Sequence, residues 1–185
     1  MKKDMIILMG GQGVGKGTFS KMLRERRDLD YIETGAMLRE LPSDSVIAQI
    51  MARGELVPDS ELLKLVESNI SGDRDLLIDG FPRTLAQAQW LVEKFADQFN
   101  VRVIYLNVPE EIMVQRIQKR MNDGGGRADD ADAAAVRRRL DTFWNVTMPA
   151  IEWLRHASGI HFCDVDVTNP SADENFVKIL AALAE

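Results

Sequence analysis

Cysteine is nearly absent from this sequence of 185 residues, in which Cys163 stands alone. A single cysteine cannot form a disulfide within the chain or a thiol-rich zinc site. Basic residues are also in the minority, with 23 Lys and Arg against 29 Asp and Glu and a formal net charge of −6. Because proteins that bind nucleic acid or membrane surfaces need a basic footprint, this balance argues against both kinds of partner.

No long apolar run is present either. The first apolar run, residues 5–9, ends at a pair of glycines. A membrane span needs about 20 apolar residues and a secretory signal about 7–15, so we expect a cytoplasmic protein. The composition, 45% hydrophobic and 28% charged, is that of an ordinary globular protein. Since we find no repeat, separating linker or oligomerisation pattern, we expect one domain over residues 1–185 and a monomer.

Short apolar runs alternate with amphipathic segments along the chain. Strands are predicted at residues 5–9, 31–32, 76–79, 101–108 and 161–165. Helices are predicted at residues 19–27, 34–39, 47–52, 61–70, 84–100, 110–121, 132–157 and 173–183. We expect Thr34 to cap the second helix, Phe99 to lie on the apolar face of the fifth and Pro149 to interrupt or kink the seventh. The alternation predicts an α/β fold, with a parallel sheet covered by helices on both faces.

The segment from Gly10 to Lys16 fits the pattern G-x-x-x-x-G-K and lies between the first predicted strand and helix. Glycines allow the backbone to wrap around a phosphate chain at the positive end of a helix, and the lysine supplies a charge to the β- and γ-oxygens. Gly17 stands where Ser or Thr usually follows the lysine, so Thr18 would supply the hydroxyl. The segment predicts a nucleoside triphosphate site. This site is not that of a GTP-binding switch protein, because the sequence has no Asn-Lys-x-Asp segment with which to bind guanine.

Several arginines lie where phosphoryl transfer would use them. Arg39 follows a Thr-Gly turn, and Arg83 follows a predicted strand at the sheet edge where α/β folds bind ligands. Arg116 and Arg120 share one helical face. The consecutive arginines 137–139 turn by about 100° per residue, so at most two of them reach one site. Phosphoryl transfer depends on positioning and on neutralisation of negative charge, which arginines provide.

Asp79 closes an apolar strand, where a buried carboxylate is costly without a cation or hydrogen-bond donors. A magnesium ion held through water would satisfy it. Further along the chain, the glycine-rich segment 122–126 lies between Arg120 and Arg127. We expect this segment to form the tip or hinge of a lid, because a kinase must exclude water while the phosphoryl group is transferred.

Together these motifs resemble the adenylate kinase family of nucleoside monophosphate kinases. The resemblance extends from residue 5 to about residue 179 and rests on segments 10–18, 34–39, 54–59, 79–84 with Gln87, and 127–130. It implies a P-loop NTPase-like core with a five-stranded parallel sheet. It also implies an arm over the monophosphate at about residues 34–63 and a short lid at about residues 121–131. The implied reaction is Mg-ATP + AMP ⇌ 2 ADP, with Mg²⁺ but no zinc, because the lid lacks the cysteine-bearing insert of longer relatives.

The resemblance also implies roles for individual residues. The catalytic residues would be Lys16, Arg83, Arg127 and Arg139. The ATP-binding residues would be Gly11, Gly13, Val14, Gly15, Lys16, Gly17, Thr18, Arg116 and Arg120. The AMP-binding residues would be Thr34, Gly35, Arg39, Glu55, Val57, Gly80, Arg83, Gln87, Arg127 and Arg139. In addition, Asp79 would hold Mg²⁺ through water.

The sequence departs from the family pattern at four places. Gln12 replaces a proline of the phosphate loop, and Ala36 replaces an aspartate expected near the water shell of the metal. The stretch 39–54 is several residues shorter than is usual in the family, which shortens the arm over the acceptor base. Compared with the family pattern, one extra residue lies between Arg127 and Arg139. Arg138 is therefore an alternative to Arg139 for the role of the second lid arginine.

Two other functions fit the same sequence. The chain could be a kinase for another monophosphate such as UMP or CMP, although Thr34 and Gln87 favour adenine. It could also be a catalytically weak nucleotide-binding or regulatory module, which Gln12, Ala36 and the shortened arm support. The charged residues named above argue against the second alternative, since a module without turnover need not retain them.

Overall fold

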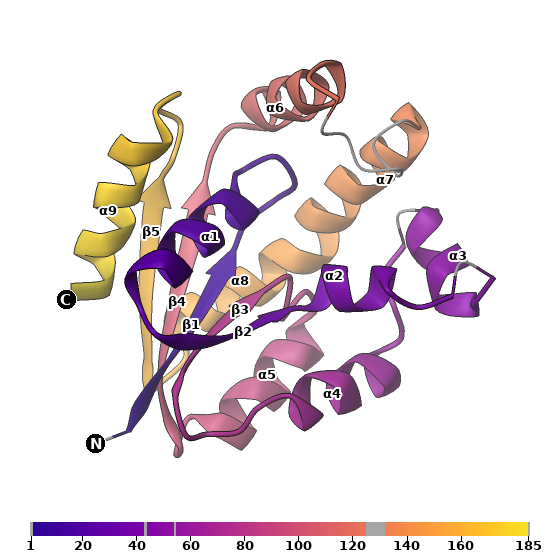
Figure 1. Cartoon of the computed structure of the whole chain (residues 1–185). Coiled ribbons are helices and arrows are strands. Elements are labelled where there is room, and N and C mark those ends of the chain that lie inside the picture. Colours follow the sequence, from indigo (N-terminus) through magenta and orange to yellow (C-terminus); the bar gives the residue numbers. More distant parts are fainter. Residues whose placement is uncertain (1, 43, 54, 125–131, 185) are drawn as a thin grey trace.

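The computed structural model describes residues 2–42, 44–53, 55–124 and 132–184. Its centre is a five-stranded sheet in which all pairings are parallel, in the order β2-β3-β1-β4-β5 (Figure 1). The strands are β1 (Lys3–Met9), β2 (Leu29–Glu33), β3 (Asp75–Asp79), β4 (Phe99–Asn107) and β5 (Ile160–Asp166). The predictions of an α/β fold and of a five-stranded parallel sheet are confirmed.

Helices join the strands and cover both faces of the sheet. They are α1 (Lys16–Arg26), α2 (Thr34–Arg39), α3 (Val46–Ala52), α4 (Asp59–Ser68), α5 (Leu85–Phe95), α6 (Glu110–Asn122), α7 (Ala133–Thr142), α8 (Met148–His156) and α9 (Ala172–Ala184). Figure 1 shows α1 and α9 in front of the sheet and α5 and α8 behind it, and each of these two pairs is in contact. In the described part of the chain, no helix is both long and apolar enough to span a membrane.

The inner strands are buried on both faces, which explains their continuous apolar sequences. Met5–Met9 of β1 are each at most 3% exposed, and Leu76–Ile78 of β3 at most 2%. By contrast, β5 lies at the edge of the sheet, and most of its residues are only partly buried or exposed. Because all strands run in the same direction, their carboxyl ends lie at one edge of the sheet. The segments that lead to α1, α2 and α5 begin at this edge.

Two local expectations were wrong. Phe99 is the first residue of β4, where it pairs with Lys3, and does not belong to α5, which ends at Phe95. Its four-residue spacing from Phe95 continued the helical pattern, but pairing with β1 gives its backbone hydrogen-bond partners within the sheet. Thr34 does not cap α2, because Glu33 occupies the N-cap position. Thr34 is instead the first helical residue, and its hydroxyl donates to the carbonyl of Asp79 at 3.5 Å.

The expected interruption at Pro149 is confirmed. Between α7 and α8 the backbone passes through a π-helical turn, η2 (Phe143–Thr147), and Pro149 lies in the first turn of α8. Proline has no N–H to donate to the preceding turn, and its ring collides with the carbonyl four residues earlier. The wider π turn accommodates this defect without separating the two helices.

Candidate active site

The loop between β1 and α1 uses glycines in left-handed conformations. Gly13 has a φ of 80°, and Gly15, the N-cap of α1, has a φ of 102°. Side chains disfavour these conformations. Lys16 begins α1, and its Nζ donates to the carbonyls of Gly10 at 2.7 Å and Gly11 at 2.9 Å. The ammonium therefore lies over the loop, beside a helix N-terminus whose unpaired N–H groups favour an anion.

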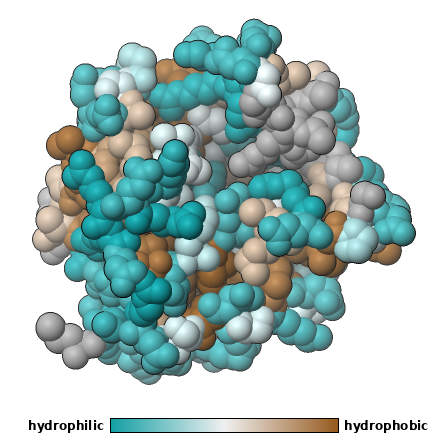
Figure 2. All heavy atoms as spheres, viewed as in Figure 1, coloured by the Kyte–Doolittle hydropathy of each residue, from teal (hydrophilic) through white to brown (hydrophobic). Residues whose placement is uncertain are grey.

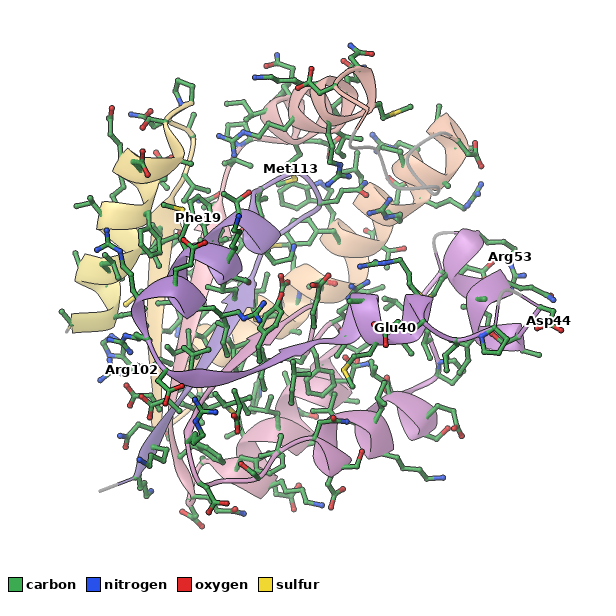
Figure 3. All side chains as sticks on the ribbon, viewed as in Figure 1. Phe19, Glu40, Asp44, Arg53, Arg102 and Met113 are labelled. Carbon is green, nitrogen blue, oxygen red and sulfur yellow. The ribbon has the colours of Figure 1, made fainter. Side chains whose placement is uncertain are left out.

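This loop is packed tightly beneath α6. A Cβ atom on Gly13 would lie 2.6 Å from the carbonyl oxygen of Met113, and one on Gly11 would lie 2.5 Å from the Met113 sulfur. Figure 3 shows Met113 between α6 and the loop. Gln12 adds a polar contact, because its Nε2 donates to the carbonyl of Val136 in α7 at 2.8 Å. In place of the family's proline ring, the glutamine thus attaches the loop to a second helix.

The carboxyl group of Asp79 is buried at the end of β3. The residue is 5% exposed, and its Oδ2 accepts a hydrogen bond from the hydroxyl of Ser20 in α1 at 3.3 Å. Burial raises the pKa of Asp79, and the nearby charge of Glu33 adds to this effect. The positive charges of Lys16 and Arg83 act in the opposite direction without cancelling it. An ionised carboxylate here is costly, and a further cation would offset that cost.

Arg83 is held where β3 leads into α5. Its Nε donates to the carbonyl of Gly80 at 2.7 Å. Gly80 has a φ of 86°, and a Cβ atom there would lie 2.8 Å from the hydroxyl oxygen of Thr34 and 3.2 Å from an Arg83 nitrogen. Glycine at this position therefore allows the guanidinium group to fold back against the backbone.

The side-chain amide of Gln87 is buried, and each end has a defined partner. Its Oε1 accepts from the backbone N–H of Arg83 at 2.7 Å, and its Nε2 donates to Asp59 Oδ1 at 2.5 Å. A backbone N–H can only donate and a carboxylate can only accept, so the orientation of the amide is unambiguous. Beyond these two contacts, the amide of Gln87 has one further N–H and one further lone pair.

A cavity of about 440 Å³ joins the phosphate loop, Asp79 and Arg83. In the described part of the chain, six basic and two acidic residues line it: Lys16, Arg39, Arg83, Arg116, Arg120, Arg139, Glu33 and Asp79. The basic residues come from α1, α2, α6, α7 and the turn after β3. On the face shown in Figure 2, hydrophilic residues predominate. Although the net charge of the chain is −6, this lining favours a ligand with several negative charges.

Arg116 lies at the end of this cavity near the turn between β5 and α9. Its guanidinium group donates to the carbonyls of Val14 and of residues 167–169, the shortest distance being 2.8 Å to Val167. Burial lowers the pKa of Arg116. These hydrogen bonds fix the plane of the guanidinium group next to Asn169 and Pro170, which also line the cavity.

A second pocket, of about 30 Å³, shares Gly35, Leu56 and Arg83 with the cavity. Its walls include the buried Thr34, Val57 and Gln87. Pockets for small molecules are typically roughly 300–1,000 Å³, so a purine base does not fit in this volume. Binding of a base here would require this pocket to widen.

The amino-acid sequence matches that of a known protein family. The family model described as Adenylate kinase matches residues 8–158. The chain belongs to the adenylate kinase family. Curated proteins named adenylate kinase match nearly the whole chain. That of Prochlorococcus marinus (strain MIT 9301) is 34% identical over 90% of this chain and 92% of its own length. That of Mesoplasma florum is 32% identical over 96% of this chain and 99% of its own length.

As a member of the adenylate kinase family, the protein is a phosphotransferase of the nucleoside monophosphate kinase class. The structure brings most of the expected site residues together. The cavity is lined by Gly11, Gly13, Val14, Gly15, Lys16, Gly17, Thr18, Gly35, Arg39, Asp79, Gly80, Arg83, Arg116, Arg120 and Arg139. The small pocket is lined by Thr34, Gly35, Glu55, Val57, Arg83 and Gln87. Arg127 and most of the expected lid lie outside the described residues.

The two alternative lid-side arginines of this adenylate kinase family member have different surroundings. Arg139 lines the cavity. Arg138 donates from Nε to the carbonyl of Arg53, at the end of α3, at 2.7 Å. The carboxylate of Glu55 accepts two hydrogen bonds from Arg53 at 2.9 and 3.0 Å. The geometry therefore favours Arg139 over Arg138 as the arginine that meets a ligand.

Two features of the cavity lining were missed in the sequence. Glu33 ends β2, and Asn169 and Pro170 follow β5. Both lie at or just beyond the carboxyl end of a strand, where α/β sheets bind ligands, and Asn-Pro is typical of a turn. These signals could have indicated both features once the order of the strands was known.

Gly13→Ala should lower the free energy of unfolding by roughly 1–3 kcal/mol, because the new Cβ meets the Met113 carbonyl and the φ of 80° becomes strained. Gly17→Ala is the matched control, since its added Cβ has no atom within 4 Å apart from its chain neighbours and the backbone of its own helix. Its stability should be unchanged or rise by up to about 1 kcal/mol, because alanine favours the helix. Urea unfolding would measure both variants, and equal stabilities would contradict the tight fit beneath α6.

Asp79→Asn should be more stable than the wild type at pH 7 without nucleotide. The pKa of Asp79 is raised in the folded state, so its ionised form opposes folding above that pKa. The advantage of the uncharged variant should shrink as the pH falls and Asp79 takes up its proton. Denaturant unfolding at a series of pH values would measure this difference. A variant that is less stable at pH 7, or a difference independent of pH, would contradict the cost assigned to the buried charge.

Proposed function

We propose that the protein transfers the γ-phosphoryl group of Mg-ATP to AMP and so produces two ADP. The observation that carries this proposal is the cavity in which the phosphate loop and Lys16 face the same space as Arg39 and Arg83. Donor and acceptor phosphates would meet there among six basic side chains. Transfer between two phosphates needs positioning and charge neutralisation rather than a covalent intermediate, and fixed cations supply both.

On the donor side, the phosphate loop and Lys16 would bind the β- and γ-phosphates of ATP. Arg120 would reach the same phosphates, and Arg116 would stack on the adenine. The hydrogen bonds that hold Arg116 to backbone carbonyls support this role, because they fix its guanidinium plane at the end of the cavity.

On the acceptor side, Arg39 and Arg83 would bind the phosphate of AMP. Thr34, the backbone at Val57 and Gln87 would contact its adenine, within an arm formed by about residues 34–63. The fixed orientation of the Gln87 amide supports this assignment. Its remaining lone pair and N–H match the amino group and the N1 acceptor of adenine.

The residues present also fit the magnesium ion that members of the family use with ATP. Asp79 is a buried carboxylate whose charge calls for a further cation, and Thr18 lines the same cavity. Within the described ranges, no three His, Cys, Asp or Glu side chains are grouped to chelate a metal directly. Asp79 would hold the ion through water. When bound, the ion would neutralise charge on the β- and γ-phosphates.

During transfer, the remaining task of the protein is to hold the charges in place and to exclude water. Lys16, Arg83 and Arg139 would surround the transferred group, together with Arg127 from the lid. Each of the three described residues lines the cavity, and Arg83 is braced by the carbonyl of Gly80. Closure of the lid and of the acceptor arm would prevent transfer to water.

The substrate assignment predicts that only AMP supports rapid ADP formation from Mg-ATP, in a panel with GMP, UMP, CMP and a control without acceptor. The reason is the match between adenine and the fixed amide of Gln87. A coupled spectrophotometric assay would measure the rates. A preference for UMP or CMP would retain the kinase class but contradict Thr34 and Gln87 as the residues that select adenine. ATP binding without transfer to any acceptor would indicate a regulatory module instead.

Lys16→Ala should lower kcat/KM by a factor on the order of 10²–10⁵, the range for losing a cation that stabilises the transition state. Lys21→Ala is the matched control, because Lys21 lies on the same helix with its side chain 78% exposed. It should change kcat/KM by less than about twofold, as expected for a solvated charge outside the cavity. Steady-state kinetics would measure both, and a loss below tenfold for Lys16→Ala would contradict its assignment to the phosphate site.

A further inference from the structure

The sequence lacks the aspartate expected beside the metal, since Ala36 occupies its place, but the structure puts another carboxylate at the same edge of the sheet. Glu33 is the last residue of β2, and Asp79 is the last residue of β3. The two strands are parallel neighbours, and Glu33 is the register partner of Asp79. Both residues line the cavity that holds the phosphate loop. Glu33 is thus the second acidic group of the described lining.

The carboxylate of Glu33 is held in place from two sides. Its Oε2 accepts from the hydroxyl of Tyr31 at 3.1 Å, and its Oε1 pairs with an Arg39 nitrogen at 3.0 Å. Burial raises the pKa of Tyr31, and the charges of Asp79 and Glu33 raise it further. The tyrosine therefore remains a hydrogen-bond donor to Glu33. This anchoring gives the carboxylate a fixed place beside the buried Asp79, with its side chain still 27% exposed.

The ion pair with Arg39 makes the charge of Glu33 dependent on the acceptor site. Under the proposed function, Arg39 binds the phosphate of AMP. A guanidinium group that turns to this phosphate leaves Glu33 Oε1 without the partner that it has here. Glu33 and Asp79 then present two carboxylates to one cavity, and a divalent cation is the ligand that offsets such a pair.

We propose that Glu33 acts with Asp79 as the second carboxylate for the hydrated magnesium ion, in place of the aspartate that is missing at Ala36. This inference rests on the proposed function. Glu33 would accept hydrogen bonds from water bound to the ion and would not contact the metal itself. The alternative role is purely local, namely that Glu33 only orients Arg39, and the experiment below separates the two.

Glu33→Gln keeps the size of the side chain and an oxygen for Tyr31 but removes the charge. The measurement is the affinity for a non-hydrolysable ATP analogue, by calorimetry, with Mg²⁺ and with a chelator, in each case with saturating AMP so that Arg39 is occupied by the acceptor phosphate. Glu33→Gln should lower the gain in affinity due to Mg²⁺ by about tenfold or more, the usual scale for a residue that binds a metal through another ligand. Affinity in the chelator should match the wild type, which also shows that the variant is folded.

Two further variants sharpen this test. Glu40→Gln is the matched control, because Glu40, labelled in Figure 3, is exposed at the end of α2 and does not line the cavity. It should leave the Mg²⁺ effect unchanged. Ala36→Asp combined with Glu33→Gln returns a carboxylate to the expected position and should restore most of the Mg²⁺ effect.

An unchanged Mg²⁺ effect in Glu33→Gln overturns the inference. If AMP affinity falls at the same time, Glu33 only orients Arg39. If the double variant does not restore the Mg²⁺ effect, this also contradicts the proposal that Glu33 acts in place of the aspartate missing at Ala36. A wild type that binds the analogue equally with and without Mg²⁺, and forms no ADP from ATP and AMP, contradicts the proposed function itself. The two failures are therefore distinguishable.

Discussion

The buried carboxylate of Asp79 is the constraint around which the site is arranged. It lies at the end of β3, between β1, which leads to the phosphate loop, and β2, which ends at Glu33. A charge in this position needs partners, and the structure provides the hydroxyl of Ser20 and the fields of Lys16 and Arg83. These partners do not bring its pKa back to the ordinary value. The fold therefore bears an electrostatic cost that a bound cation would offset, as is common at functional sites.

For the binding of phosphate groups, the location of the charged residues matters more than the net charge of the chain. The chain has a net charge of −6, which argues against long basic surfaces, yet six basic side chains line one cavity. These cations repel one another, so rigid elements have to hold them in place. Arg83 is braced by the carbonyl of Gly80, and Arg116 by the carbonyls of Val14 and the β5–α9 turn. Such preorganisation is what a phosphoryl-transfer site requires, because its catalysis depends on fixed charges.

Most of the fold and much of the site could be predicted from the sequence because their signals are local. Continuous apolar runs indicated β1 and β3, and the glycine-lysine pattern indicated the phosphate loop. Phe99 was misplaced because its spacing fits a helix, whereas pairing with Lys3 puts it in β4. Glu33 was missed because its proximity to Asp79 depends on which strands are neighbours. Periodicity does not contain that information.

The sequence by itself determined the parallel α/β architecture, the phosphate loop and the family, since each follows from short motifs and their order along the chain. Only the tertiary structure decided which charged groups face one another. It placed Arg139 rather than Arg138 in the cavity, fixed the amide of Gln87 between Asp59 and Arg83, and set Glu33 beside Asp79. The physical reason is that these contacts join residues far apart in the sequence. Their distances depend on strand order and helix packing, which local propensity does not determine.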